Sequence, residues 1–196
     1  DVILTNLNYY STIKNVNFSG TSVAASIIGN SLADEIRAGN GGSTMSGGEG
    51  YTVESGSKTK AVTSADKLYG GNGTDYFVYD VGYGKDQFLT FGSGDVVSLG
   101  AGIKKSDLTI TDKKNVVTVA IGGNAVDTES PLTTTANSTF TVTKTSDDVA
   151  IKFVTGDGAS FTYGNTQSAY VSLDAKYSTM AVSTSAQATV DRSEER

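Results

Sequence analysis

The sequence predicts an all-β fold with two successive parts, a coil of stacked short strands and then a region of antiparallel hairpins. Two observations support this. A nine-residue pattern of glycines, aspartates and large apolar residues repeats through the first half of the chain. After Leu99 the pattern stops, and apolar and polar residues alternate every second position. We expect the coil over residues 1–98, irregular at 38–60, the antiparallel capping region over 99–177 and a flexible tail over 178–196.

Composition excludes several classes of protein. The 196 residues contain no histidine and no cysteine, which excludes Ser-His-Asp and Cys-His nucleophiles, zinc sites of the usual ligands, and disulfides. The net charge of −6 argues against a nucleic-acid partner, and no apolar run approaches the ~20 residues of a membrane-spanning helix. The 23 glycines are typical of a secreted, turn-rich β protein. Because the chain opens at Asp1, we expect it to be a piece of a longer protein.

The clearest repeat unit is residues 70–78, which read G-G-x-G-x-D-x-U-x, where U is a large apolar residue. The same frame runs through residues 61–69 and, after two extra residues, through 81–89 and 90–98. Each unit therefore has an aspartate at its sixth position and an apolar residue at its eighth. The aspartates are Asp66, Asp75, Asp86 and Asp95, and the apolar residues are Leu68, Phe77, Phe88 and Val97.

A weaker block of the same pattern lies upstream. Residues 29–37 carry Asp34 at the aspartate position, but the next unit has Ser43 there. Residues 47–55 have Thr52 and Glu54 at the two key positions, so we interpret Glu54 as marking a broken unit rather than as a metal ligand. The apolar positions continue further than the aspartates do, at Tyr9, Phe18, Ile27, Ile36 and Met45.

The unit has a clear physical interpretation. Its glycines permit tight turns, and its last three residues form a short strand that points the apolar side chain inward. One unit cannot bury that side chain alone, so units stack into a coil with parallel strands on two faces. Stacked turns align carbonyl and carboxylate oxygens, the ligands that Ca²⁺ prefers. The alternative is that the aspartates are ordinary turn residues bonded to their own backbone.

This repeat pattern resembles the RTX (hemolysin-type) family, whose calcium-binding nonapeptide repeats occur in proteins that bacteria secrete. The resemblance is close over 61–98, where the unit 70–78 and the segments 82–86 and 91–95 carry it, and loose over 20–55. It implies a parallel β-roll in which Ca²⁺ lies between turns on the same side. Matched by position, the implied ligands are the side chains of Asp66, Asp75, Asp86 and Asp95, with Asp34 as a weaker fifth, and the carbonyls of Gly71, Gly73, Gly82 and Gly84. We expect about one to three ions.

Other polar and aromatic residues lie outside this set. Asp80 and Asp112 fall off the frame, and we expect both to be solvated turn residues. Four tyrosines cluster in the sequence and could form a carbohydrate-binding platform, although such residues also cover the flank of a roll. They are Tyr69, Tyr76, Tyr79 and Tyr83.

The second half predicts hairpins that cap the last exposed strands of the coil. We expect one hairpin from 108–111 and 116–121, a second from 139–143 and 149–154, a turn at 156–158 into a strand at 160–163, and a strand at 169–173. The tail after residue 178 fits either a linker or the carboxy-terminal secretion signal that the resemblance implies.

The sequence thus predicts a non-enzymatic calcium-binding module of a secreted or cell-surface protein, folding on Ca²⁺ after export. One alternative is a structural or adhesive unit that self-associates into a surface layer or filament. Another is a module that binds carbohydrate, including a cell-surface glycan, or modifies polysaccharides. No further group of carboxylates converges in the sequence, so we do not expect an enzyme.

Overall fold

The structure is a computed structural model that describes residues 2–4, 12–55, 58–125, 133–134, 138–164, 169–171 and 180–182. The chain divides into two compact units, residues 1–163 and 164–196. The described residues form β-strands and two short 3-10 turns, η2 (Lys105–Asp107) and η3 (Gly123–Ala125). Among them no helix has the length and apolar character needed to cross a membrane.

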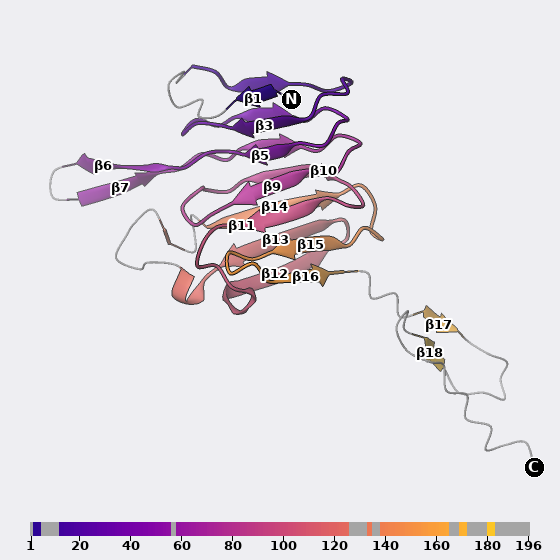
Figure 1. The fold of residues 1–196 in the computed structure, drawn as a ribbon. Helices are drawn as coiled ribbons and strands as arrows, with labels where there is room; N and C mark the ends of the chain where they lie inside the picture. The colour runs from indigo at the N-terminus through magenta and orange to yellow at the C-terminus, as the bar shows by residue number, and fades with distance from the viewer. Residues whose placement is uncertain are drawn as a thin grey trace, which may run out of the picture. The chain divides into compact units, whose positions relative to one another are not determined.

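Two seven-stranded sheets build the first unit (Figure 1). In spatial order, the first sheet contains β1 (Val2–Leu4), β3 (Ala25–Ile28), β5 (Thr44–Ser46), β9 (Tyr76–Tyr79), β11 (Val96–Leu99), β15 (Ile151–Val154) and β16 (Ser160–Tyr163). The second sheet contains β12 (Leu108–Lys113), β13 (Val116–Ile121), β14 (Thr139–Lys144), β10 (Gln87–Phe91), β8 (Lys67–Tyr69), β4 (Glu35–Arg37) and β2 (Asn15–Asn17).

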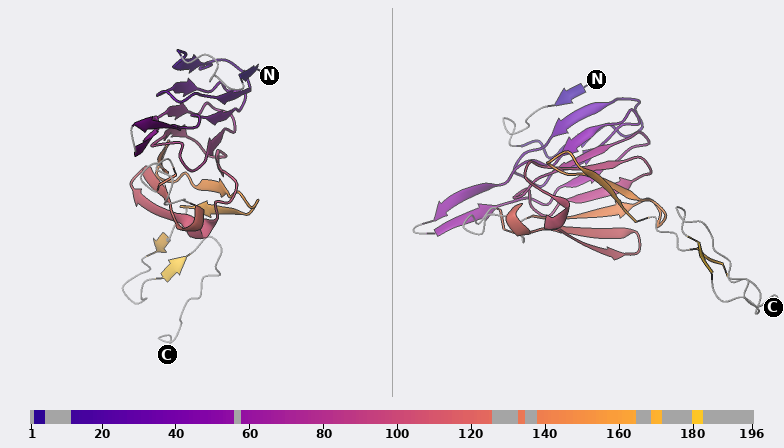
Figure 2. Two further views of the ribbon diagram at one scale, coloured as in Figure 1. Left: turned by 90° about the vertical axis from the view of Figure 1, so that its left-hand side faces the viewer. Right: turned by 60° about the horizontal axis from the view of Figure 1, so that its bottom comes forward.

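The described strands of the repeat region alternate between the two sheets. Their neighbours within each sheet are parallel, with Ile36 beside Leu68 in one sheet and Phe77 beside Val97 in the other. The strand pairs β12–β13, β13–β14 and β15–β16 are antiparallel. Both sheets are therefore mixed, with their antiparallel pairs toward one end (Figure 2). The predicted all-β class is confirmed.

The apolar residues of the repeat point between the two sheets, as the sequence predicts. The eighth-position side chain is fully or almost fully buried in β3, β4, β5, β8, β9, β10 and β11. These side chains are Ile27, Ile36, Met45, Leu68, Phe77, Phe88 and Val97, with exposures of 1 % or less. The Phe88 ring lies 5.0 Å from that of Phe77 and 4.9 Å from that of Phe140, so both halves of the chain share one core.

The second half confirms two predicted pairings and corrects one. The β12–β13 hairpin and the β15–β16 hairpin form as expected. The predicted hairpin of 139–143 with 149–154 is wrong, because β14 lies beside β10 and β13 in the second sheet whereas β15 lies beside β11 in the first. Alternation specifies which side chains face the core, and both segments satisfy it in different sheets.

The irregular region has a definite structure. Residues 44–46 still form a strand of the first sheet, β5, with Met45 buried. Beyond it, β6 (Tyr51–Ser55) and β7 (Lys58–Val62) form a separate two-stranded antiparallel ribbon, which we call the arm. The arm extends away from the strands of the two large sheets (Figures 1 and 2).

The second unit contains one described strand pair. β17 (Ala169–Val171) and β18 (Met180–Val182) are antiparallel, so a strand forms within the predicted 169–173. β18 lies within the predicted flexible tail of 178–196, so this part of the predicted tail forms a strand. The rest of both predicted segments lies outside the described residues.

Candidate metal centre

The five repeat aspartates are all buried, each exposed by 4 % or less. Asp34, Asp66 and Asp86 directly precede β4, β8 and β10 of the second sheet, and we call them the Asp66 column. Asp75 and Asp95 precede β9 and β11 of the first sheet and form the Asp75 column. The predicted aspartates thus form two groups, one in the turns that lead into the second sheet and one in the turns that lead into the first sheet.

In the Asp66 column, two of the three carboxylates bind the backbone of the neighbouring strand, whereas Oδ2 of Asp34 accepts from the N–H of Asn30 in its own turn at 2.7 Å. Oδ1 of Asp66 accepts a hydrogen bond from the backbone N–H of Asp34 at 2.7 Å, across 32 residues of chain. Oδ1 of Asp86 accepts one from the N–H of Asp66 at 3.0 Å, across 20 residues. These bonds satisfy N–H groups at the starts of buried strands, where an unpaired donor is costly.

In the Asp75 column, both oxygens of each carboxylate have a donor. Oδ1 of Asp75 accepts from the N–H of Ser43 at 2.7 Å, and Oδ1 of Asp95 accepts from the N–H of Asp75 at 2.9 Å. The Oδ2 atoms accept from their own turns, from Gly71 and Gly92, each at 2.7 Å. Asp75 and Asp95 therefore stabilise their turns without any bound ion.

The Asp66 column differs, because two of its carboxylate oxygens are buried without a partner. Oδ1 of Asp34 and Oδ2 of Asp86 have no hydrogen-bond donor among the described residues. The remaining Oδ2 of Asp66 accepts from the Ser64 hydroxyl at 3.0 Å. A buried carboxylate oxygen with no donor requires a proton or a cation to offset its lost hydration.

The electrostatics of the Asp66 column follow from this burial. Burial raises the pKa of Asp34 to about 6, although the hydrogen bond from the Asn30 N–H and then the charge of Lys14 act to lower it. Burial raises the pKa of Asp66 to about 7, with the Asp34 charge adding to the effect. The pKa of Asp86 is raised well above its usual value, first by burial and then by the charge of Asp66. Among the described residues, the one salt bridge joins Arg37 to Glu35, so none neutralises this column.

The Asp75 column is buried as well, but its hydrogen bonds oppose the effect of burial. Burial raises the pKa of Asp95 to about 6, while bonds from Asp75 and Gly92 lower it. The pKa of Asp75 is raised by burial and lowered by bonds from Gly71 and Ser43.

The predicted glycine carbonyls also divide between the two sides. Gly82 and Gly84 lie in the turn that leads to Asp86, and the Gly84 carbonyl accepts a hydrogen bond from the buried Tyr79 hydroxyl at 2.6 Å. Gly71 and Gly73 lie in the turn that leads to Asp75. A Cβ at Gly71 would overlap the Gly39 carbonyl, and one at Gly73 would overlap the Gly42 backbone, so these glycines permit close packing of neighbouring turns.

The acidic side chains alone do not complete a metal site. Among the described residues, no group of three or more Asp or Glu side chains gathers closely enough to hold an ion. A calcium site in this part of the chain needs backbone carbonyls or water as its other ligands.

Three other acidic residues differ in their surroundings. Asp80, expected to be solvated, is half-buried against Gly100, its Oδ1 accepts from the Val81 N–H at 2.8 Å, and burial raises its pKa. Asp112 is exposed as expected, but it lies in β12 rather than in a turn. Glu54 lies exposed on the arm, where it accepts a hydrogen bond from the Thr59 hydroxyl at 2.8 Å.

The four clustered tyrosines do not form a common platform. Tyr79 is fully buried in the core. Tyr76 is 44 % exposed on the first sheet, whereas Tyr69 belongs to the second sheet and packs under the Arg37 guanidinium at 3.7 Å. Tyr83 is half-buried, with its ring 5.8 Å from that of Tyr79.

Three serines that the sequence did not single out as site residues form hydrogen bonds in or beside the two columns. Ser43 occupies the aspartate position ahead of β5, and its hydroxyl accepts the Ala25 N–H at 3.3 Å. Ser64 binds Asp66, and buried Ser138 accepts the N–H of Gly82 at 3.1 Å. The position of Ser43 in the nine-residue frame was the one available signal for these roles.

Comparison with protein-family models and with curated proteins assigns no role to these columns. No protein-family model matches the chain, and no curated protein matches its sequence. The functional argument therefore depends on the geometry of the two columns.

Proposed function

We propose that this chain is a non-enzymatic, calcium-binding β-roll module of a secreted or cell-surface bacterial protein. The observation that carries the proposal is the pair of buried, unpartnered oxygens in the Asp66 column, Asp34 Oδ1 and Asp86 Oδ2. The nine-residue pattern and the parallel strand pairs of the repeat region support a roll. The resemblance to RTX repeats supports both calcium and an extracellular location.

The donor chemistry of the Asp66 column fits Ca²⁺. This hard cation takes 6–8 oxygen ligands in flexible geometry. One ion would take at most two carboxylates of the column, such as Asp66 and Asp86 from neighbouring strands, because no three of the described acidic side chains gather around one point. The adjacent turn would supply the Gly82 carbonyl, and further carbonyls or water would supply the other ligands. The Gly84 carbonyl already accepts hydrogen bonds from the Tyr79 hydroxyl and from the Thr139 N–H, so we do not count it among the ligands.

We assign the Asp75 column a different role. Asp75 and Asp95 match the ligand positions of the repeat, but backbone N–H groups already occupy all four of their oxygens. In the proposed module Asp75 and Asp95 link neighbouring turns by hydrogen bonds, and the ion binds at the Asp66 column instead.

The consequence for folding is conditional stability. Without calcium, folding at neutral pH either leaves the buried carboxylates of the Asp66 column charged, so that they repel one another and lose hydration, or requires them to bind protons. Both outcomes oppose folding at this pH. Outside the cell, Ca²⁺ at about 1 mM and a dissociation constant of about 10⁻⁴ M would add roughly 1.4 kcal/mol per site. Such a contribution is a sizeable part of the marginal stability of a domain.

The experiment compares Asp86→Asn with Asp75→Asn in the full chain. Thermal unfolding is measured in EDTA, in Ca²⁺ and in Mg²⁺, and Ca²⁺ binding is measured by calorimetry. We expect Asp86→Asn to lose the calcium-dependent stabilisation without losing stability in EDTA, because it removes an uncompensated buried charge. Asp75→Asn should lose stability equally in EDTA and in Ca²⁺, because an amide N–H₂ would face the N–H of Gly71. A wild-type protein that Ca²⁺ neither binds nor stabilises would overturn the proposal.

A further inference from the structure

The arm is the feature that neither the core nor the candidate metal centre explains. β6 and β7 pair with each other, and neither joins a third strand among the described residues. A two-stranded ribbon is marginally stable in water by itself. Both of its outer edges present unpaired backbone N–H and C=O groups, which can pair with another strand.

The two edges of the arm differ in chemistry. β7 carries Lys58 and Lys60, both exposed, and lysine on an edge strand opposes pairing with another chain. β6 carries no lysine or proline and exposes Tyr51 by 46 % and Val53 by 38 %. The edge of β6 is therefore the one suited to pairing.

From this geometry we infer that two copies of the chain associate by antiparallel pairing of their β6 edges, centred on Val53. Val53 would then face Val53 of the second copy, Thr52 would face Glu54, and Tyr51 would face Ser55. No two like charges would lie directly opposite each other, which favours the pairing. Pairing through β7 about its centre would instead set Lys60 against Lys60.

The symmetry of this pairing favours a second copy over an unrelated strand. An antiparallel pair of identical strands is related by a two-fold axis, so the interface closes after two chains. The result is a four-stranded ribbon, which meets the number of strands that a free-standing sheet needs. The contact is short, so we expect a weak, reversible dimer at the low end of interface sizes. The inference does not depend on the metal site.

The test is sedimentation of the full chain in Ca²⁺ between about 10 μM and about 1 mM, a range suited to a weak interface. Wild type should shift from monomer to dimer across this range. Val53→Lys and Val53→Glu should each weaken dimerisation by at least about tenfold, because like charges would meet on the two-fold axis. Val53→Glu isolates this effect, because Val53 lies opposite Lys60 of β7, which repels a lysine at position 53 within the arm but attracts a glutamate. An equimolar mixture of the two variants should restore the dimer, because lysine then faces glutamate.

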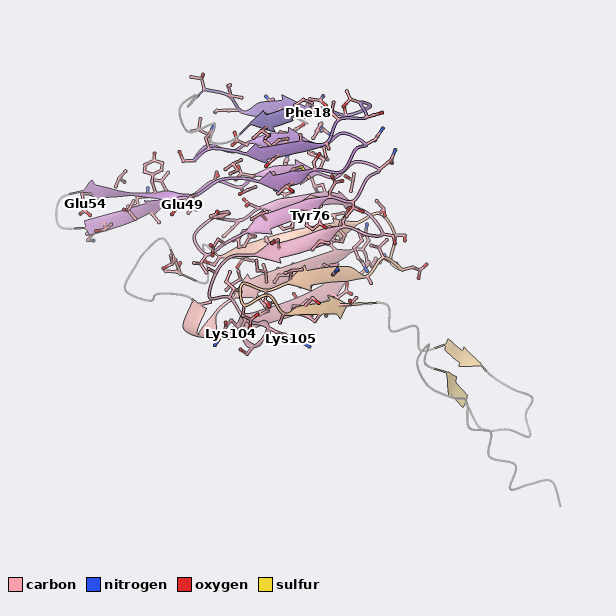
Figure 3. All side chains as sticks on the ribbon, viewed as in Figure 1. Phe18, Glu49, Glu54, Tyr76, Lys104 and Lys105 are labelled. Carbon is pink, nitrogen blue, oxygen red and sulfur yellow. The ribbon has the colours of Figure 1, made fainter. Side chains whose placement is uncertain are left out.

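The matched control is Tyr76→Lys, which places the same charge on an exposed aromatic residue of the first sheet, away from the arm (Figure 3). It should dimerise as wild type does, and circular dichroism should show all variants folded. The inference fails if wild type remains monomeric throughout. It also fails if Val53→Lys dimerises normally or if the mixture stays monomeric, since either result excludes a β6 pair centred on Val53.

Discussion

Oδ1 of Asp86 accepts a hydrogen bond from the backbone N–H of Asp66, 20 residues earlier, at 3.0 Å, while the buried Oδ2 of the same carboxylate has no donor in the part of the chain that the structure describes. One oxygen thus links neighbouring strands by a hydrogen bond, and the other is a buried acceptor that a proton or a cation would stabilise. The Asp75 column lacks this division, because all four of its carboxylate oxygens have donors. This contrast leads to several testable consequences.

Stability without calcium should fall as the pH rises from about 4 to about 7. The folded-state pKa values of Asp34, Asp66 and Asp95, about 6, about 7 and about 6, exceed the value near 3.9 expected in the unfolded chain. The folded state therefore binds more protons, and its advantage is complete below pH 4 and lost above pH 7. Thermal unfolding in EDTA should show this decline, and saturating Ca²⁺ should reduce it. A flat profile in EDTA would contradict the burial of these carboxylates.

Tyr79→Phe should destabilise the protein by about 0.5–1.5 kcal/mol, because it removes a buried hydrogen bond to the Gly84 carbonyl, which keeps the hydrogen bond from the Thr139 N–H. The midpoint temperature should fall by about 2–4 °C per kcal/mol. We expect the same loss in EDTA and in Ca²⁺, because the ion has the Gly82 carbonyl available. A loss confined to the calcium-loaded protein would show instead that the Gly84 carbonyl is a ligand.

Gly47→Ala should cost about 1–3 kcal/mol, as overpacking does in a well-filled core. A Cβ at this position would overlap the Asp66 carboxylate, which hydrogen bonds from Asp34 and Ser64 hold in place. Calcium affinity should fall with stability, since Asp66 must move. Gly92→Ala is the control, because its Cβ would lie at an ordinary 3.6 Å from Oδ2 of Asp95. Chemical denaturation and calorimetry measure both effects, and equal losses in the two variants would refute the argument.

Phe140→Ala should destabilise the whole first unit by about 3–5 kcal/mol. The Phe140 ring lies 4.9 Å from that of Phe88 and 4.5 Å from that of Tyr79, so it joins the second half to the core of the repeat region. Unfolding should remain a single transition at a lower denaturant concentration. Two separate transitions would mean that the repeat region and the later strands fold independently.

The sequence predicted most accurately what depends on spacing along the chain. The nine-residue frame identified the buried apolar residues from Ile27 to Val97 and the five buried aspartates, because each unit repeats the same local turn and strand. Even Ser43 takes the structural position that the frame assigns to it. The nine-residue frame did not predict the burial of Asp80 or of the tyrosines, because these side chains pack against distant segments of the chain. Asp80, for example, lies against Gly100.

Tertiary structure decided the properties that depend on which segments meet. Alternation in residues 139–154 specified inward faces, but packing against β10 and β11 placed β14 and β15 in different sheets. The frame gave all the aspartates the same predicted role, yet donors from neighbouring turns satisfy Asp75 and Asp95 and leave Asp86 with a bare oxygen. A repeat pattern determines local geometry and burial, whereas the partners of a buried polar atom are set by chain segments that only folding brings together.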